Sequence, residues 1–211
     1  MTDDGHVLRW LTEGTASATG HEFFRTLVDG LSAALGTKGA WVSSYLPETR
    51  QLRAIAMKMG EEWLDGFVYA LEGTPCETSI DRGEQVFIPE RLIELYPDDK
   101  PFAPIAAVSY LGVPLFDVDG TTTIGHLAVL HDEPLTEARF TSVFQIFAAR
   151  AVSELRRMRI EEEVREREAQ LTCLLDGTMD AIIGLDEDLR ITFVNGAAEK
   201  ALGAAGARGG Q

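Results

Sequence analysis

A cysteine in a short helix-start motif is the first candidate for chemistry in this sequence. Cys76 lies in the segment EGTPCETSIDRG, which runs from Glu72 to Gly83. Backbone amides at the start of a helix can lower the pKa of a thiol and so prime it for oxidation, metal binding or covalent attachment of a chromophore. The carboxylate of the adjacent Glu77 opposes that lowering. The motif therefore offers thiol chemistry at Cys76 with one neighbouring charge working against it.

The rest of the motif is explained by the way a helix begins. With Thr74 as N-cap, Pro75 takes the first helical position, where its missing N–H costs nothing, and Glu77 takes the third. This spacing predicts a capping box, and Gly83 predicts the end of a two-turn helix. Cys76 can then equally be a small apolar side chain that packs inward, so both interpretations of this residue stay open.

Other candidate binding residues come from the middle of the chain. His126 lies in GHLAVL, which has the pattern of a strand, and it is either a satisfied strand residue or a ligand to a cofactor. Four aromatic residues flank the irregular middle region and either line a pocket or belong to the core: Tyr110, Phe87, Trp63 and Phe67. No pair among the four histidines has the spacing of a metal site, so no metal ligand is predicted. The identity of any cofactor does not follow from these residues.

The composition narrows the partners of this 211-residue chain. Lys and Arg number 19 against 34 Asp and Glu, which gives a formal charge of -15. Phosphate backbones and anionic membrane surfaces would be repelled, so neither a nucleic acid nor a membrane is expected as a partner. No signal sequence is recognised, and no apolar run approaches the roughly 20 residues that span a bilayer. Because Cys76 and Cys173 lie far apart, reduced thiols in a cytoplasm are predicted rather than a disulfide.

The elements that would position these residues alternate between helices and antiparallel strand pairs. They follow in this order: a helix at 21–36, a hairpin at 40–57, a short helix-like stretch at 61–67, an irregular region at 66–107, a hairpin at 109–132 and a helix from about 135. The second hairpin turns at Asp119-Gly120, a dipeptide favoured where turn residues need positive φ. This order predicts an α+β fold in which helices pack on one face of an antiparallel sheet.

The last helix is predicted to continue through a charged stretch at 154–172 that contains no Gly or Pro. Apolar residues recur along it at spacings typical of coiled-coil a and d positions: Ile160, Val164, Leu171 and Leu174. Arg167 interrupts that seam. A solvated single helix and a parallel dimeric coiled coil both fit, and the second predicts a homodimer formed through this helix.

Three stretches together resemble a GAF domain. They are GTPCE, the segment from SYLGVPL to HDEPLT, and FQIFAARAVSELRRMRIEEEV, and the resemblance covers about residues 20–155. A later stretch, DAIIGLDEDLRITFVNGAAEKALG, is similar to the opening of a PAS domain and stops well before a complete one. The implied organisation has four parts: an N-terminal arm at 1–18, a GAF domain at 19–153, a signalling helix at 154–172 and an incomplete PAS segment at 173–211. We therefore expect a fragment of a longer signalling protein of the sensor histidine kinase type, or a truncated reading frame.

The resemblance implies a sensory module that binds a small molecule or cofactor beneath the irregular region and relays the signal through a dimeric exit helix. The main alternative is a dimerisation and relay element that binds no ligand. Two narrower alternatives use Cys76, namely covalent attachment of a bilin and thiol-dependent reduction of free methionine sulfoxide. The reduction needs a resolving thiol, and the other cysteine, Cys173, lies on the linker. No catalytic residue is predicted.

Overall fold

The computed structural model describes residues 18–97, 99, 106–135 and 137–208, with the side chains of 137–142 and 204–208 left outside that description. Residues 1–17 of the predicted N-terminal arm lie outside the described residues. The chain forms two compact units, Met1–Met158 and Arg159–Gln211. None of the helices in the described residues is both long and apolar enough to cross a membrane.

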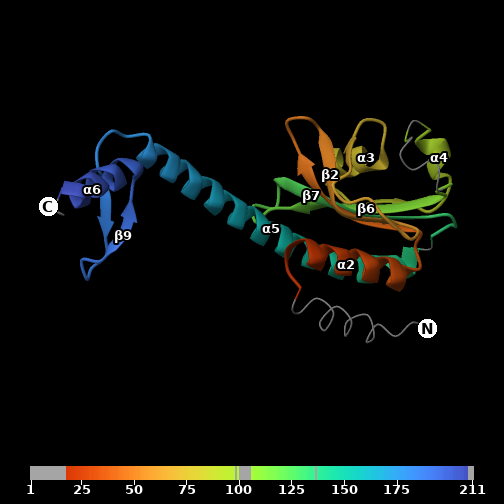
Figure 1. Ribbon diagram of the computed structural model, residues 1–211. Coiled ribbons are helices and arrows are strands. Elements are labelled where there is room, and N and C mark those ends of the chain that lie inside the picture. Colours follow the sequence, from red (N-terminus) through yellow and green to blue (C-terminus); the bar gives the residue numbers. More distant parts are fainter. Residues whose placement is uncertain (1–17, 98, 100–105, 136, 209–211) are drawn as a thin grey trace. The chain divides into compact units, whose positions relative to one another are not determined.

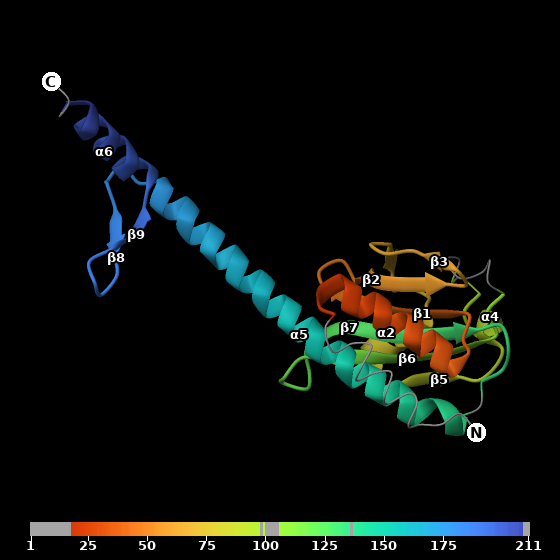
Figure 2. The same cartoon turned by 60° about the horizontal axis from the view of Figure 1, so that its bottom comes forward.

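The first unit is built on one antiparallel sheet of seven strands (Figures 1 and 2). The strands are β1 Gly39–Leu46, β2 Gln51–Met59, β3 Glu62–Trp63, β4 Val68–Ala70, β5 Val86–Ile88, β6 Ser109–Phe116 and β7 Thr123–His131. Their order is β3-β2-β1-β7-β6-β5, and β4 also pairs with β2. Both predicted hairpins form, β1 with β2 and β6 with β7, and β1 pairs with β7 to join them.

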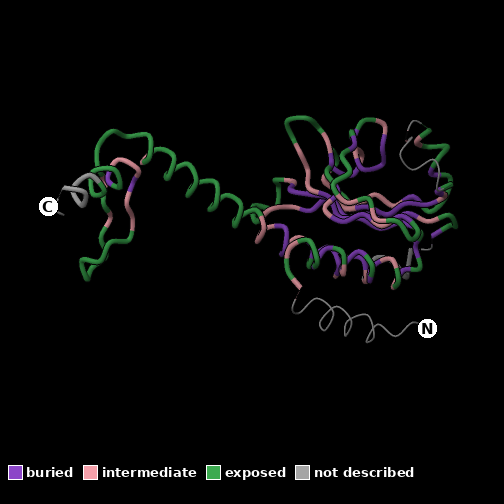
Figure 3. Tube along the Cα trace, in the orientation of Figure 1, coloured by how far each residue is buried: buried purple, intermediate pink, exposed green. Residues whose placement is uncertain are grey.

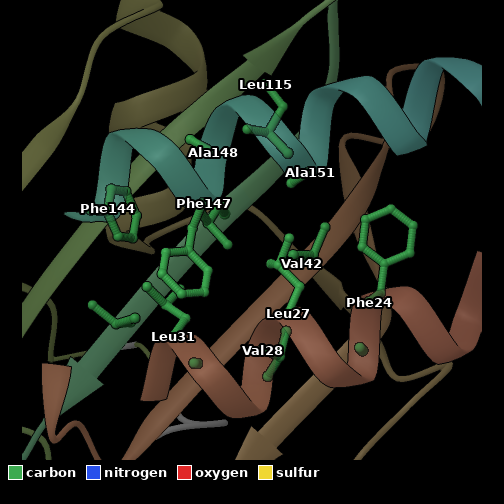
Figure 4. Packing of buried hydrophobic residues seen from close by; sticks show 14 of the residues in the cluster. Phe24, Leu27, Val28, Leu31, Val42, Leu115, Phe144, Phe147, Ala148 and Ala151 are labelled. Carbon is green, nitrogen blue, oxygen red and sulfur yellow. The ribbon is translucent and has the colours of Figure 1, made fainter. Parts of the chain in front are cut away.

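Two long helices cover one face of this sheet, which we call the α2/α5 face (Figure 2). They are α2, Gly20–Leu35, and α5, Glu137–Asp176. Leu27 and Leu31 of α2 pack with Phe144 and Phe147 of α5 and with Val42 of β1, and all five are fully buried (Figure 4). The apolar periodicity that predicts these two helices in the sequence is therefore the periodicity that fills this half of the core.

The opposite face is covered by two short helices, so the prediction that helices pack on one face is incomplete. These are α3, Pro75–Arg82, and α4, Leu92–Leu95, and we call this side the α3/α4 face (Figure 1). Successive side chains of a strand point to opposite faces, and the central strands are apolar at successive positions. Trp41 therefore packs beneath α3 while its neighbour Val42 packs beneath α2. The irregular region supplies the second cover that such a sheet needs.

The helix-like stretch predicted at 61–67 is wrong, because these residues extend the sheet. Trp63 of β3 pairs with Lys58 of β2 in antiparallel register. The carboxylate of Asp65 accepts a hydrogen bond from the Met57 N–H at 3.0 Å, and the Leu64 N–H donates to the Met57 carbonyl at 2.8 Å. The stretch thus finds its hydrogen-bond partners on β2, which outweighs its local helix propensity.

The second unit contains the end of α5, a two-stranded hairpin and a final helix. The hairpin pairs β8, Ile183–Leu185, with β9, Ile191–Val194, and α6, Gly196–Arg208, follows. Asn195 is fully buried, and its side-chain oxygen accepts from the backbone N–H groups of Ile182 and Ala198. Its amide N–H groups donate to the carbonyl of Leu175 and to neighbouring oxygens. Residues 159–174 of α5 are exposed to solvent (Figure 3).

The packing of α2 against the sheet predicts the cost of removing one core side chain. Leu31→Ala should lower the free energy of unfolding by about 2–5 kcal/mol, because it leaves a cavity among side chains that cannot fully collapse. Leu95→Ala is the matched control, since Leu95 is 60% exposed and its loss should cost under about 0.5 kcal/mol. Urea unfolding followed by tryptophan fluorescence measures both. Equal losses in the two variants would contradict the assignment of Leu31 to the core.

Candidate functional site

A chain of polar side chains is buried on the α3/α4 face. The Trp41 indole Nε1–H donates to the Tyr69 hydroxyl at 3.0 Å, and that hydroxyl lies 3.9 Å from the Cys76 Sγ. The Tyr110 hydroxyl donates to the same sulfur at 3.4 Å and lies 3.2 Å from His126 Nε2. We call these five residues the Tyr110 cluster. Each is at most 5% exposed, so their polar atoms must find partners inside the protein.

Strand alternation and the start of α3 bring the cluster together from five separate segments, with Tyr69 contributed by β4. Tyr110 lies on β6 and His126 on β7, where their rings stack with centroids 6.5 Å apart, and Trp41 lies on β1. The start of α3 lays Cys76 over these strands. Gly112 is required beneath them, because a Cβ there would lie 2.0 Å from the Tyr110 hydroxyl and 2.8 Å from His126 Cε1. The glycine of SYLGVPL therefore gives the Tyr110 side chain room to fold back along its own strand.

The helix start holds Cys76 in place. Thr74 is the N-cap of α3, its Oγ1 accepts from the Glu77 N–H at 3.2 Å, and Gly83 ends the helix in a left-handed conformation. The Glu77 carboxylate reaches back to the Gly73 N–H at 3.0 Å, one residue before the partner that a capping box predicts. The Thr74 N–H instead donates to the Leu71 carbonyl, so the turn preceding α3 is closed as well. Capping contacts within the local sequence thus hold the start of α3 in place without any ligand.

Burial keeps the whole cluster uncharged. Removal from water raises the pKa of the Cys76 thiol to about 12, despite hydrogen bonds from Tyr110 and Tyr69 that lower it. Burial likewise raises the pKa of Tyr69 and of Tyr110 well above the usual value for a phenol. Burial lowers the pKa of His126 to about 3, so its imidazole is neutral at physiological pH. The thiol activation that the helix start could provide is therefore outweighed by desolvation.

Buried polar atoms of His126 and Asp99, near the cluster, lack partners within the described part of the chain. Nδ1 of the fully buried His126 has no hydrogen-bond partner there, and neither has Oδ1 of the half-buried Asp99. Burial raises the pKa of Asp99 to about 6, and its charge in turn raises the pKa of Cys76 and of Tyr110, which places the carboxylate near them. Unpaired buried polar atoms cost free energy, so these are the positions where a bound group would contribute most.

The structure brings together three of the six predicted ligand candidates: Cys76, Tyr110 and His126. Trp63 and Phe87 instead pack against the core of the α2/α5 face. Phe87 lies between Val86 and Ile88, which both face α3, so alternation along β5 turns it to the other side. The Arg25 guanidinium lies over the Trp63 ring, with its Cζ 4.8 Å from the ring centroid.

Phe67, the sixth candidate, lies at the surface beside the cluster. It is 40% exposed, and its ring stacks on Tyr69 with centroids 5.9 Å apart. Sequence reasoning missed Trp41, Tyr69 and Asp99 as members of this site. The alternation in AWVSSYL could have placed Trp41 and Ser43 on one face, whereas no local pattern marks Tyr69 or Asp99.

No metal centre accompanies the cluster in the described residues. Within the described ranges, no group of three or more His, Cys, Asp or Glu side chains is arranged to hold a metal ion. Cys76 and Cys173 are both free, the first buried and the second exposed on α5. Apart from the Asp99 carboxylate, the site consists of neutral hydrogen-bonding groups and aromatic side chains, and Cys76 is not a thiolate there at physiological pH.

A family model for the GAF domain matches residues 19–155, which include the sheet, the four helices that cover it and the Tyr110 cluster. The chain belongs to the GAF domain family. The resemblance of residues 20–155 to a GAF domain is thereby confirmed, and GAF domains are in general regulatory modules. No curated protein is significantly similar in sequence.

Solved structures similar to this GAF domain come from proteins with different activities. The GAF domain of a phosphoenolpyruvate-protein phosphotransferase from Acinetobacter has a TM-score of 0.62 at 16% identity, covering 77% of this chain and 99% of that one. The free methionine-R-sulfoxide reductase from Neisseria meningitidis, solved with its substrate, has a TM-score of 0.62 at 16% identity, covering 76% and 95%. The chromophore-binding domain of a bacteriophytochrome from R. palustris has a TM-score of 0.56 at 10% identity, covering 77% and 62%. At these identities the likeness shows the fold alone.

The burial of Cys76 predicts a large difference in reactivity between the two cysteines. At about pH 8, a thiol with a pKa of about 12 is ionised in only about one molecule in ten thousand. Iodoacetamide should therefore alkylate the exposed Cys173 in the folded protein and reach Cys76 only after denaturation. Peptide mass spectrometry of wild type and of Cys173→Ser measures both sites. Native-state alkylation of Cys76 at a rate close to that of Cys173 would contradict the buried position.

The lowered pKa of His126 predicts that acid weakens the fold. Below about pH 6.5 the unfolded chain protonates this imidazole, whereas the folded protein resists protonation until about pH 3, so stability falls as the pH falls between them. Lowering the pH from about 7 to about 4.5 should therefore reduce the free energy of unfolding of both proteins. The reduction should be roughly 2–3 kcal/mol smaller in His126→Gln than in the protein that retains His126. Urea unfolding at the two pH values measures this difference.

Asp99 acts in the opposite direction and must be removed from the comparison. Its raised pKa means that the folded protein takes up a proton near pH 6 that the unfolded chain takes up only near pH 4, so Asp99 stabilises the fold as the pH falls through that window. The His126→Gln comparison is therefore made in an Asp99→Asn background. Identical pH dependence with and without His126 would show that this imidazole is solvated.

Proposed function

We propose that this GAF domain is the sensory module of a multidomain signalling protein of the sensor histidine kinase type. In this proposal a small molecule or cofactor binds at the α3/α4 face and its presence is relayed through α5. The observation that carries the proposal is that one part of α5 is buried in the domain core and another part is exposed to solvent. Its residues Phe144, Phe147 and Leu155 belong to the domain core, and the same helix continues to Asp176 as an exposed rod. A change in the core can therefore alter the rotation or register of the exposed part.

Two charged residues of α5 support a link between the helix and the sheet. The Arg156 guanidinium donates to the carbonyl of Phe116 at 2.8 Å. Phe116 is the last residue of β6, the strand that carries Tyr110. Glu154 of α5 accepts from the Gly20 N–H at the start of α2 and pairs with Arg157, two contacts that lower the pKa of Glu154. The last core turn of α5 is thus hydrogen-bonded to the strand of the candidate site and to the helix beside it.

We further propose that two copies of the chain pair through the exposed part of α5, which would act as a signalling helix. An unpartnered apolar series supports this: Ile160 is 62% exposed, Val164 48%, Leu171 59% and Leu174 70%. The spacing of this series is that of a coiled-coil seam, and the residues around it are charged, as in flanking positions of a parallel coil. A second copy would bury the series in the way that a coiled coil requires.

The unit after α5 is proposed to be the start of a PAS domain. The β8–β9 hairpin and α6 match the order of elements that the resemblance implies for that start. Ile183, Leu185 and Ile191 of the hairpin remain 43–60% exposed. Isolated hairpins are marginal in water, so these apolar residues fit a sheet that further strands would complete.

A second candidate function is a dimerisation and relay element without a ligand. The observation that favours it is direct contact among the side chains of the cluster, in which Tyr110 reaches both Cys76 and His126. Covalent bilin attachment and reduction of methionine sulfoxide both need an ionised, accessible Cys76, which its burial and raised pKa oppose. Both free cysteines fit the proposed location in a reducing cytoplasm.

Native mass spectrometry of the protein purified from a bacterial cytoplasm tests the proposal. We expect a dimer that carries a non-covalent small mass. Val164→Lys places a charge in the seam and should give a monomer that keeps the small mass, because the site lies in the other unit. Ile93→Lys is the matched control, since Ile93 on α4 is also 48% exposed and its replacement should leave the dimer intact.

The relay is tested on the same protein with spin labels on Cys173, which is exposed on α5 while Cys76 is buried. Distances between the two labels in the dimer should shift when the small molecule is removed by dialysis under denaturing conditions and refolding. A dimer without any adduct would favour the ligand-free relay element. A monomeric wild type without adduct would overturn both candidate functions.

A further inference from the structure

The unpartnered Nδ1 of His126 determines which kind of ligand group can form a hydrogen bond at this site. The imidazole is fully buried and neutral, its Nε2 contacts the Tyr110 hydroxyl at 3.2 Å, and its Nδ1 has no partner among the residues that the structure describes. A neutral imidazole carries one N–H and one bare nitrogen. Whether the open Nδ1 donates or accepts is therefore decided by the direction of the bond to Tyr110.

The rest of the cluster fixes that direction. The Tyr110 hydroxyl has a single proton, and its geometry directs that proton to the Cys76 Sγ at 3.4 Å. The contact between Tyr110 and His126 then needs the proton from the imidazole, so Nε2 carries the N–H and donates to the phenol oxygen. At the other end of the cluster the Trp41 indole can only donate, and it donates to Tyr69. His126 Nδ1 is accordingly left as a bare acceptor.

Resting on the proposed sensory function, we propose that the site recognises an uncharged aromatic amide or amino-substituted heteroaromatic ring that donates an N–H to His126 Nδ1. Asp99 Oδ1, whose carboxylate acts on Cys76 and Tyr110, is a further acceptor beside the cluster that is unpartnered in the described residues. Trp41, Tyr69 and Tyr110 belong to the same buried cluster, so a group that reaches His126 Nδ1 would enter aromatic surroundings.

The same surroundings disfavour an anion. Among the buried residues of the described chain there is no Lys or Arg, so a buried carboxylate or phosphate would meet no cation from them. It would instead face the lone pair of His126 and the oxygens of Asp99. Burying an unpaired charge is far more costly than burying a hydrogen-bonded neutral group. An uncharged donor therefore complements the site, and an anion of the same shape does not.

The tautomer of His126 tests the first half of this inference without any ligand. Long-range ¹H–¹⁵N correlation spectra distinguish the two imidazole nitrogens, and the spectrum of His126→Gln assigns the His126 signals. We expect a protonated Nε2 and an unprotonated Nδ1 at about pH 7. In Tyr110→Phe the acceptor for Nε2–H is gone, and the preference between the tautomers should weaken or reverse. A protonated Nδ1 in wild type would overturn the inference and leave the proposed sensory function standing.

Matched probe pairs test the second half. Benzamide and nicotinamide carry the neutral donor, whereas benzoate and nicotinate have the same rings with a carboxylate. We expect the two amides to bind more tightly than their carboxylates and to move the His126 Nδ1 resonance in the hydrogen-bonded direction. His126→Phe removes the acceptor and should weaken amide binding about 2–10-fold, the usual effect of one lost hydrogen bond. Tyr110→Phe provides a second variant, with the same direction of change, if His126→Phe does not fold.

The outcomes separate this inference from the proposed function. Carboxylates that bind as tightly as the amides would overturn the ligand class, and so would probes that bind without moving the His126 resonance. Failure of both amides to bind, in a protein that carries an endogenous small mass by native mass spectrometry, overturns the class while the sensory function stands. Failure of both amides with no endogenous mass overturns the inference together with the ligand-binding function on which it rests.

Discussion

The central strands carry apolar side chains on both faces, and the rest of the architecture depends on covering both. The α2/α5 face is closed by two long helices whose periodicity is plain in the sequence. The other face has to be closed by the segment between the two hairpins, whose described residues form only short helices and short strands. These short elements place both polar and apolar side chains against the sheet. The polar groups that become buried there have to form hydrogen bonds with one another. The Tyr110 cluster is the result of that requirement.

The cluster also explains why one fold can serve unrelated chemistry. The structural neighbours include a reductase and a chromophore-binding domain, yet the thiol of this chain is held protonated beneath α3 by desolvation. A shared fold therefore does not carry a shared chemistry. In this chain the set of side chains at the site is mostly aromatic and uncharged, with the carboxylate of Asp99 beside it and an open acceptor at His126 Nδ1. The character of the site follows from burial more than from the presence of a cysteine.

The sequence predicted those parts of the fold that depend on interactions between residues close together in the chain. The helix start at Thr74, both hairpins and the two long helices could be read because capping residues and apolar periodicity act within a few residues. The stretch containing Trp63 was misassigned as helix because its hydrogen-bond partners lie on β2, outside any local window. Tyr69 could not be placed in the site for the same reason, since only the pairing of β4 with β2 brings it beneath Trp41. Phe87 was grouped with residues of the other face because a strand of three residues is too short to reveal its alternation.

Asn195 links the end of one element to the beginning of another. Its amide donates to the Leu175 carbonyl in the last turn of α5, its carbonyl oxygen caps α6 through the Ala198 N–H, and Asp176 accepts from the Gly196 N–H. One buried side chain thus satisfies backbone groups that a helix terminus and a hairpin would otherwise leave unpaired. The last turn of α5, the hairpin and the first turn of α6 therefore gain their order together. Amide hydrogens in these three segments would exchange through a common opening event, and the segments would form a single cooperative folding unit.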